Sequence, residues 1–226
     1  MAVKFFVLGL PGSGKSTVAR YISTYARDEG WETNHFNDYG ILQDMFLADK
    51  EQKQFKPADH GGFDIIDLRA FDVALKSLEQ QVNEYISTAK SEEIILIEFS
   101  RNDYQRAFQQ FSEAFFQNAY FLYLNVELET CKRRIRERIT HPTTPDDHFV
   151  SEYIFKAYYN RDNGQYLPSI LEREYKLDKE RVLVIDNDCS LEEASNRIKP
   201  FIDAIIDLES ALIRTSIGQK VLFAGV

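Results

Sequence analysis

The chain has 226 residues, 44% of them hydrophobic and 28% charged, a composition that is typical of a folded globular protein and excludes a largely disordered one. We expect residues 1–226 to form a single domain, since this length suits one large domain. The net charge of −9 makes nucleic acid an unlikely partner, because gripping a phosphate backbone depends on Lys and Arg.

The two cysteines, Cys131 and Cys189, are not spaced for a zinc site or a disulfide framework, and we expect both to be small buried hydrophobes. The first apolar run is interrupted by glycines after a few residues, which is too soon for a signal peptide or a membrane span. We therefore expect a reducing, cytoplasmic location and no membrane partner. The oligomeric state is left open.

The first predicted strand, residues 4–8, leads directly into a glycine-rich run and then into a predicted helix at 15–29. The run has the spacing GxxxxGKS, in which glycines let backbone N–H groups face a β-phosphate and the helix adds its positive dipole end. Lys15 supplies a point charge, and the Ser16 hydroxyl is placed to coordinate Mg²⁺. The segment predicts a site for ATP and Mg²⁺ formed by Gly9, Pro11, Gly12, Ser13, Gly14, Lys15, Ser16 and Thr17.

The rest of the chain alternates strand-like and helical patterns, as expected for a doubly wound parallel α/β sheet with helices on both faces. Further strands are predicted at 31–36, 93–99, 120–124 and 182–185. Helices are predicted at 63–90, 103–118, 128–139, 149–160, 166–176 and 191–208. Ser190 and Glu193 predict a capped start of the last helix. An exposed loop is expected at 141–148, and residues 210–226 are left unassigned.

Residues just after the strands are the first site candidates, because ligands of such sheets bind outside the carboxyl ends of the strands. Glu98 ends the third strand and can hold Mg²⁺ or accept a proton, or it is an ordinary polar strand end. Arg101 can clamp a phosphate or support transition-state charge, or it is a surface arginine paired with Asp103. Asp38 follows the second strand as a candidate base or acceptor contact, with a local turn role as the alternative.

A basic stripe on the helix at 128–139 includes Arg134 and Arg138, which lie four residues apart on one face. Such a stripe is usually a solvated face, but these two precede the predicted loop and could close over phosphates with a mobile flap. The histidines are dispersed and expected in loops or on the surface: His35, His60, His141 and His148. Four aromatic residues flank the candidate site and could stack on a planar substrate: Phe36, Tyr39, Phe99 and Tyr104.

Together these features resemble the P-loop kinases of small molecules, which include nucleoside monophosphate kinases, deoxynucleoside kinases, gluconate kinase and shikimate kinase. The glycine run matches fully, residues 120–138 are similar to the strand and helix before the family's lid, and residues 182–193 are similar to its last strand and closing helix. The resemblance implies a P-loop NTPase fold with a five-stranded sheet of order 2-3-1-4-5 and a short lid at about 134–165. It also implies that Arg134 lies on the adenine ring and Arg138 contacts phosphates.

The chain departs from the family pattern in ways that leave the acceptor undefined. The third strand ends in Glu98 and not in the commoner Asp, no thymidylate kinase Asp-Arg pair follows it, and the lid lacks the zinc cysteines of long adenylate kinases.

The prediction is an ATP-dependent phosphotransferase for a small acceptor, most simply a nucleoside or nucleotide, with ATP and Mg²⁺ as cofactors. Alternatives are a sugar or small-metabolite kinase of the gluconate type, an ATP-binding regulatory switch without an acceptor, and a 5′-hydroxyl polynucleotide kinase, which the net charge disfavours. Ser16 and Glu98 are the predicted metal ligands, and the predicted catalytic residues are Lys15, Asp38, Glu98, Arg101 and Arg138.

Overall fold

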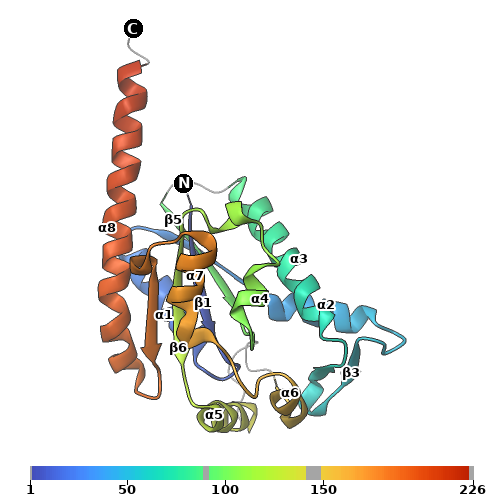
Figure 1. Ribbon diagram of the computed structural model, residues 1–226. Helices are drawn as coiled ribbons and strands as arrows, with labels where there is room; N and C mark the ends of the chain where they lie inside the picture. The colour runs from blue at the N-terminus through green and yellow to red at the C-terminus, as the bar shows by residue number, and fades with distance from the viewer. Residues whose placement is uncertain (1, 89–91, 141–148, 224–226) are drawn as a thin grey trace.

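The computed structural model describes residues 2–88, 92–140 and 149–223, with the backbone alone for 216–223. Its centre is a parallel sheet in the order β2-β5-β1-β6-β7 (Figure 1). Counted along the chain within this sheet, that is the predicted order 2-3-1-4-5. The strands are β1 (Val3–Gly9), β2 (Glu32–Asn37), β5 (Glu93–Phe99), β6 (Ala119–Asn125) and β7 (Val182–Asp186).

The sheet separates two apolar layers, because successive side chains of a strand point to opposite faces. On one face, Phe5 and Val7 of β1 pack with buried residues of α1 (Lys15–Asp28) and α8 (Leu191–Phe223). On the other face, Phe6 and Leu8 pack with the remaining helices. Those helices are α2 (Asp38–Ala48), α3 (Arg69–Ile86), α4 (Tyr104–Phe108), α5 (Leu128–Thr140), α6 (Glu152–Ala157) and α7 (Leu167–Tyr175). The α/β fold class is confirmed.

A short hairpin corrects the prediction of one helix over 63–90. Strand β4 (Phe63–Ile65) pairs antiparallel with β3 (Phe55–Pro57), and α3 begins only at Arg69. The apolar residues at 63 and 65 flank a polar one, which is the period of a strand, but Phe63 also fits the helical period of the residues that follow. Residues 89–90 of the predicted helix lie outside the described residues.

Other local predictions differ from the structure in length or in kind. The segment 103–118 forms α4 and a separate 3₁₀ turn at Glu113–Phe116, not one helix. Helix α2 follows β2 directly and was not predicted, because Asn37 indicated a turn. The Asn37 side-chain oxygen instead caps the helix by accepting a hydrogen bond from the Gly40 amide, 3.3 Å away. The predicted loop at 141–148 lies outside the described residues.

Helix α8 begins where predicted but continues well beyond it. The predicted cap is confirmed, since the Glu193 amide donates to the Ser190 hydroxyl (3.2 Å) and the Ser190 amide donates to the Glu193 carboxylate (3.0 Å). The helix was expected to end near residue 208, but it extends to Phe223 and projects past the sheet (Figure 1). Within the described residues, no helix has both the length and the apolar character needed to cross a bilayer.

Candidate functional site

The glycine-rich loop connects β1 to α1 and can be built only with glycine at two positions. Gly12 has φ +83° and Gly14 has φ +96°, a left-handed region that other residues rarely adopt. A Cβ would also lie 2.5 Å from the Cys131 carbonyl oxygen at Gly12, and 2.8 Å from the Asn187 amide nitrogen at Gly14. The loop therefore keeps its backbone exposed to a ligand at the N-terminus of α1, as an anion site requires.

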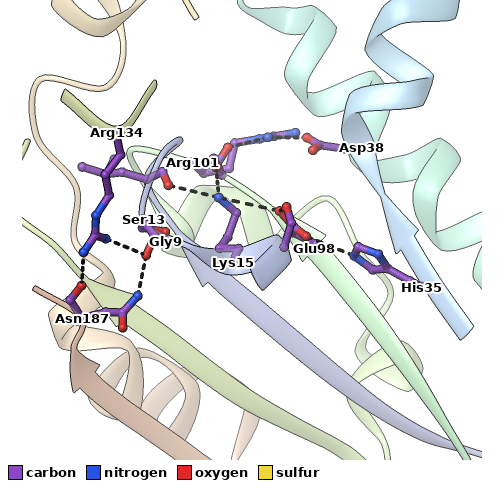
Figure 2. Close-up of polar contacts among 12 residues, drawn as sticks. Gly9, Ser13, Lys15, His35, Asp38, Glu98, Arg101, Arg134 and Asn187 are labelled. Atoms are coloured by element: carbon purple, nitrogen blue, oxygen red, sulfur yellow. Dashed lines mark hydrogen bonds and ion pairs between the residues drawn. The ribbon is translucent and has the colours of Figure 1, made fainter. Parts of the chain in front are cut away.

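Side chains from distant elements hold this loop in place (Figure 2). The Gly9 amide donates to the Tyr104 hydroxyl (2.9 Å), and the Asn187 side-chain amide donates to the Ser13 carbonyl (2.7 Å). Arg134 of α5 donates in turn to the Asn187 carbonyl (2.8 Å). Asn187 was not predicted as a site residue, although its position directly after the last predicted strand was a usable signal. Tyr104 was a candidate for stacking on a planar substrate, but its ring is buried and its hydroxyl supports the loop.

Lys15 extends from the start of α1 along the floor of the site and is buried. Its ammonium group donates to the Leu10 carbonyl (3.1 Å) and to the Ser100 hydroxyl (2.8 Å), and it lies 4.0 Å from a Glu98 carboxylate oxygen. Burial lowers the pKa of this ammonium, while the nearby Glu98 charge opposes the change. A phosphate oxygen could take the place of the neutral hydrogen-bond acceptors around Lys15.

Glu98 joins the glycine loop to the second strand. One carboxylate oxygen accepts a hydrogen bond from Ser16 (2.9 Å), and the other lies 3.1 Å from the His35 Nε2 (Figure 2). His35 was expected in a loop or on the surface. It lies within β2 and is partly buried. Strand β2 pairs with β5 so that Asn37, two residues after His35, is opposite Glu98. This pairing of strands distant in sequence is what the sequence pattern did not reveal.

The Ser16 hydroxyl and the Glu98 carboxylate fit a magnesium site. Burial raises the pKa of Glu98, but the contacts with His35 and Lys15 outweigh it, so the pKa lies below its ordinary value and the carboxylate is ionised at neutral pH. Mg²⁺ prefers oxygen ligands and is commonly bound by one or two protein groups together with phosphates and water. Within the described ranges, no three His, Cys, Asp or Glu side chains gather to form a metal site of protein ligands alone.

Asp38 and Arg101 form a buried ion pair at the far side of the site. An Arg101 nitrogen donates to Asp38 at 2.5 Å, another donates to the Phe71 carbonyl (2.9 Å), and the guanidinium lies 4.6 Å from the Phe71 ring centre. The alternative of a surface arginine paired with Asp103 is wrong, since Arg101 is only 2% exposed. Burial raises the pKa of Asp38, and the Arg101 charge only partly opposes this. Figure 2 shows the pair on the side of Lys15 opposite Arg134.

These groups surround one cavity of about 300 Å³, within the size range of small-molecule sites. The wall beside the glycine loop, which we call the donor wall, consists of Pro11, Gly12, Gly14, Lys15, Ser16, Thr17, Arg20, Arg134 and Arg138. The opposite wall, which we call the acceptor wall, consists of Asp38, Tyr39, Leu42, Phe63, Ile65, Phe71, Phe99, Phe149, Val150, Ile154 and Tyr159. Glu98 and Ser100 lie between the two walls.

The cavity brings together most of the predicted site residues. Gly9 and Ser13 belong to the loop but do not line the cavity. Arg101 does not line it either, because the Asp38 carboxylate and the Phe71 ring cover its guanidinium, so a direct contact with an acceptor is not supported. Of the other aromatic candidates, Tyr39 and Phe99 line the cavity, whereas Phe36 packs against Tyr85.

Similar solved structures share this fold at low sequence identity. A sugar kinase from Janibacter sp. is 17% identical, with a TM-score of 0.54 over 91% of this chain and 98% of that chain. Kti12 from Chaetomium thermophilum, solved with ADP-AlF3, is 14% identical, with a TM-score of 0.57 over 89% and 98%. The Mycobacterium tuberculosis APS kinase CysC, solved with AMPPNP and APS, is 14% identical, with a TM-score of 0.50 over 89% and 98%.

These likenesses confirm the fold expected from the resemblance to P-loop kinases. No curated protein sequence matches the chain significantly. A family model described as an AAA domain matches residues 6–156, which include the glycine loop, the strands up to β6, and α5 with both of its candidate arginines. Because this match spans more than half of its length, the chain belongs to the AAA domain family.

Proposed function

We propose that the protein transfers the γ-phosphoryl group of ATP to a hydroxyl group of a small acceptor, a nucleoside or nucleotide. The observation that carries this proposal is the cavity itself. Its donor wall has the loop geometry and the cations that a triphosphate needs, and it faces a second wall of different chemistry across Lys15 and Glu98. A protein that only binds ATP has no need of the second wall.

The donor wall is suited to hold the triphosphate. The amides at Gly12–Gly14 and the Lys15 ammonium face the β- and γ-phosphates, and Ser16 with Glu98 would hold Mg²⁺, which neutralises phosphate charge when bound. Arg134 and Arg138 line the same wall from α5, where they can contact the nucleotide and the transferred group. Phosphoryl transfer depends mainly on such positioning and neutralisation of charge.

Asp38 is the candidate proton acceptor. It lines the acceptor wall, and burial raises its pKa above the ordinary carboxyl value, which makes it a stronger proton acceptor. Glu98 is less suited to this role because its contacts with His35 and Lys15 lower its pKa and keep it ionised. Asp38 would orient the acceptor hydroxyl and take its proton, while the buried Arg101 keeps the Asp38 side chain in place.

Two of the similar structures support a nucleotide in the donor wall, since they contain ADP-AlF3 and AMPPNP. Two of them are named as kinases of small molecules, a sugar kinase and an APS kinase. Transfer to a small acceptor is therefore a chemistry that this fold hosts elsewhere. The acceptor of this protein has to be argued from its own residues.

The proposal is tested by measuring ADP release with Mg·ATP and a panel of acceptors. Transfer by the unmodified protein should depend on the acceptor. Lys15→Ala should lower the rate by about 10²-fold or more, as loss of a charge-stabilising group does in other enzymes. Lys76→Ala, which changes an exposed lysine of α3, is the matched control and should leave the rate unchanged. ATP hydrolysis at one slow rate whatever acceptor is present would favour the regulatory switch.

A further inference from the structure

We propose that the acceptor is an uncharged, ring-bearing alcohol of the nucleoside type, and not a phosphorylated or carboxylate compound. This inference rests on the proposed function and narrows it. It follows from the chemistry of the acceptor wall, which is apolar and aromatic, contains a carboxylate, and presents no lysine or arginine among the described residues that form it.

The aromatic side chains of the acceptor wall form stacks, and Tyr39 stands at the end of one of them. Tyr39 and Phe63 are stacked with their ring centres 5.7 Å apart and an interplanar angle of 17°, and Phe46 continues the stack behind Phe63 at 5.0 Å. Phe71 stacks in the same way on Tyr158, at 4.3 Å and 18°. Phe63 lies between Tyr39 and Phe46, and Phe71 packs against both Tyr158 and the Arg101 guanidinium. Tyr39 ends its stack at the cavity wall, where a planar ligand would continue the offset stacking.

The charges of the cavity are distributed unevenly between the walls. Lys15, Arg20 and Arg134 line the donor wall. Arg138 lines the donor wall as well, and its charge partly opposes the burial that raises the pKa of Tyr39. Its position suits the phosphoryl group in transit, because that group carries the charge that must be neutralised.

An acceptor with its own phosphate or carboxylate would place a second negative charge near the Asp38 carboxylate of the acceptor wall. Asp38 is the charged residue that lines this wall, and Arg101 is covered behind it. Lys56 of the neighbouring hairpin does not line the cavity, and its ammonium lies against the Tyr153 ring. An anion here would be desolvated without a dedicated cation, which is costly.

The closing experiment compares four acceptors with Mg·ATP: a nucleoside, its 5′-monophosphate, ribose and gluconate. The measured quantity is kcat/KM for Lys15-dependent ADP release. We expect the nucleoside to exceed its monophosphate and gluconate by about tenfold or more, because the extra charge has no cation, and to exceed ribose by about tenfold, because ribose lacks the stacking ring.

A variant that adds a positive charge to the acceptor wall tests the same inference. Val150→Arg places a guanidinium on the acceptor wall at a half-buried position, and it should lower the ratio of nucleoside to monophosphate kcat/KM by about tenfold. Leu47→Arg adds the same charge at a residue that is 56% exposed and outside the cavity, and it should leave the ratio unchanged.

The outcomes separate this inference from the proposed function. Equal or better Lys15-dependent transfer to the monophosphate or to gluconate would overturn the inference and leave the phosphotransferase function standing. Equal transfer to ribose and to the nucleoside would also overturn it, because the aromatic wall would then have no part in recognition. If no acceptor of any class gave Lys15-dependent transfer, the proposed function would fail and the inference with it.

Discussion

Asp38, the charged residue of the acceptor wall, forms a buried ion pair with Arg101. Both side chains are buried, so each depends on the other for compensation of its charge. Removing one partner of such a pair leaves an uncompensated buried charge, which costs more than the pair itself contributes to stability.

We predict that Arg101→Met lowers the free energy of unfolding by about 3–5 kcal/mol, measured by urea denaturation. The double variant Arg101→Met, Asp38→Asn should recover a large part of this loss, because no charge is then left unpaired. Arg106→Met is the matched control, since it removes the exposed pair with Asp72 and should cost less than about 1 kcal/mol. A loss as small as that of the control would show that Arg101 does not compensate Asp38.

His35 is one of the groups that lower the pKa of Glu98. The pKa of Glu98 is below its ordinary value, so this carboxyl stabilises the fold above its unfolded-state pKa, and that stability is lost as the pH falls through the folded-state value. In His35→Ala the contact that lowers this pKa is gone, and burial then acts against Lys15 and Ser16 alone. We predict that the NMR titration of the Glu98 carboxyl moves to higher pH. His60→Ala is the control, and a shift shared by both variants would refute the assignment.

Among the individual site residues, those of the glycine run could be predicted from the sequence, because their spacing is itself the signal. The sequence could also propose Glu98 and Asp38, since Glu98 lies at the end of one strand and Asp38 directly follows another. His35 and Asn187 could not be assigned, because their roles depend on which strands and loops become neighbours. The burial of Arg101 could not be predicted either, since it results from a pairing with Asp38 over 63 positions of sequence.

Among the elements, the β3–β4 hairpin and α6 together support the acceptor wall. Ser151 links them, because its hydroxyl donates to the buried Asp64 of β4 and accepts a hydrogen bond from the Ile154 amide as the N-cap of α6. Phe63 and Ile65 of the hairpin, and Ile154 of α6, all line the cavity. One serine therefore connects the hairpin to α6. The sequence pattern had placed the β4 residues in a helix at 63–90 and α6 in a helix at 149–160, with no link between the two.

We predict that Ser151→Ala lowers the free energy of unfolding by about 1 kcal/mol, the usual cost of losing an N-cap, and speeds hydrogen exchange in both α6 and the hairpin. Ser190→Ala is the matched control. It removes the N-cap of α8 at a similar cost, and exchange at the hairpin should not change. Equal exchange at the hairpin in the two variants would contradict the link through Ser151.

The central strands were predictable because a strand buried on both faces has a continuous apolar sequence. The order 2-3-1-4-5 did not follow from the strands alone and came from the resemblance to P-loop kinases. The hairpin was missed because Phe63 fits a helical period as well as a strand, and only its pairing with Pro57 distinguishes the two. The continuation of α8 past residue 208 was missed because its later sequence lacks a regular apolar stripe.

For the whole molecule, the sheet order places the two walls of the cavity. The glycine loop emerges from the central strand β1, with β6 and α5 on its donor side. On the other side, the neighbouring strand β5 carries Glu98 next to its last residue, and β2 ends directly before Asp38. The chain carries a net charge of −9, yet it collects four cations around one cavity, where a polyphosphate needs them.

The central claim is that the glycine loop and Lys15 bind the phosphates of a nucleotide, and isothermal titration calorimetry with Mg·ATP tests it most directly. We predict saturable binding of one nucleotide per chain, weakened about tenfold or more in Lys15→Ala and unchanged in Lys76→Ala. Absence of binding to the folded protein, or equal affinity in Lys15→Ala, would contradict the account.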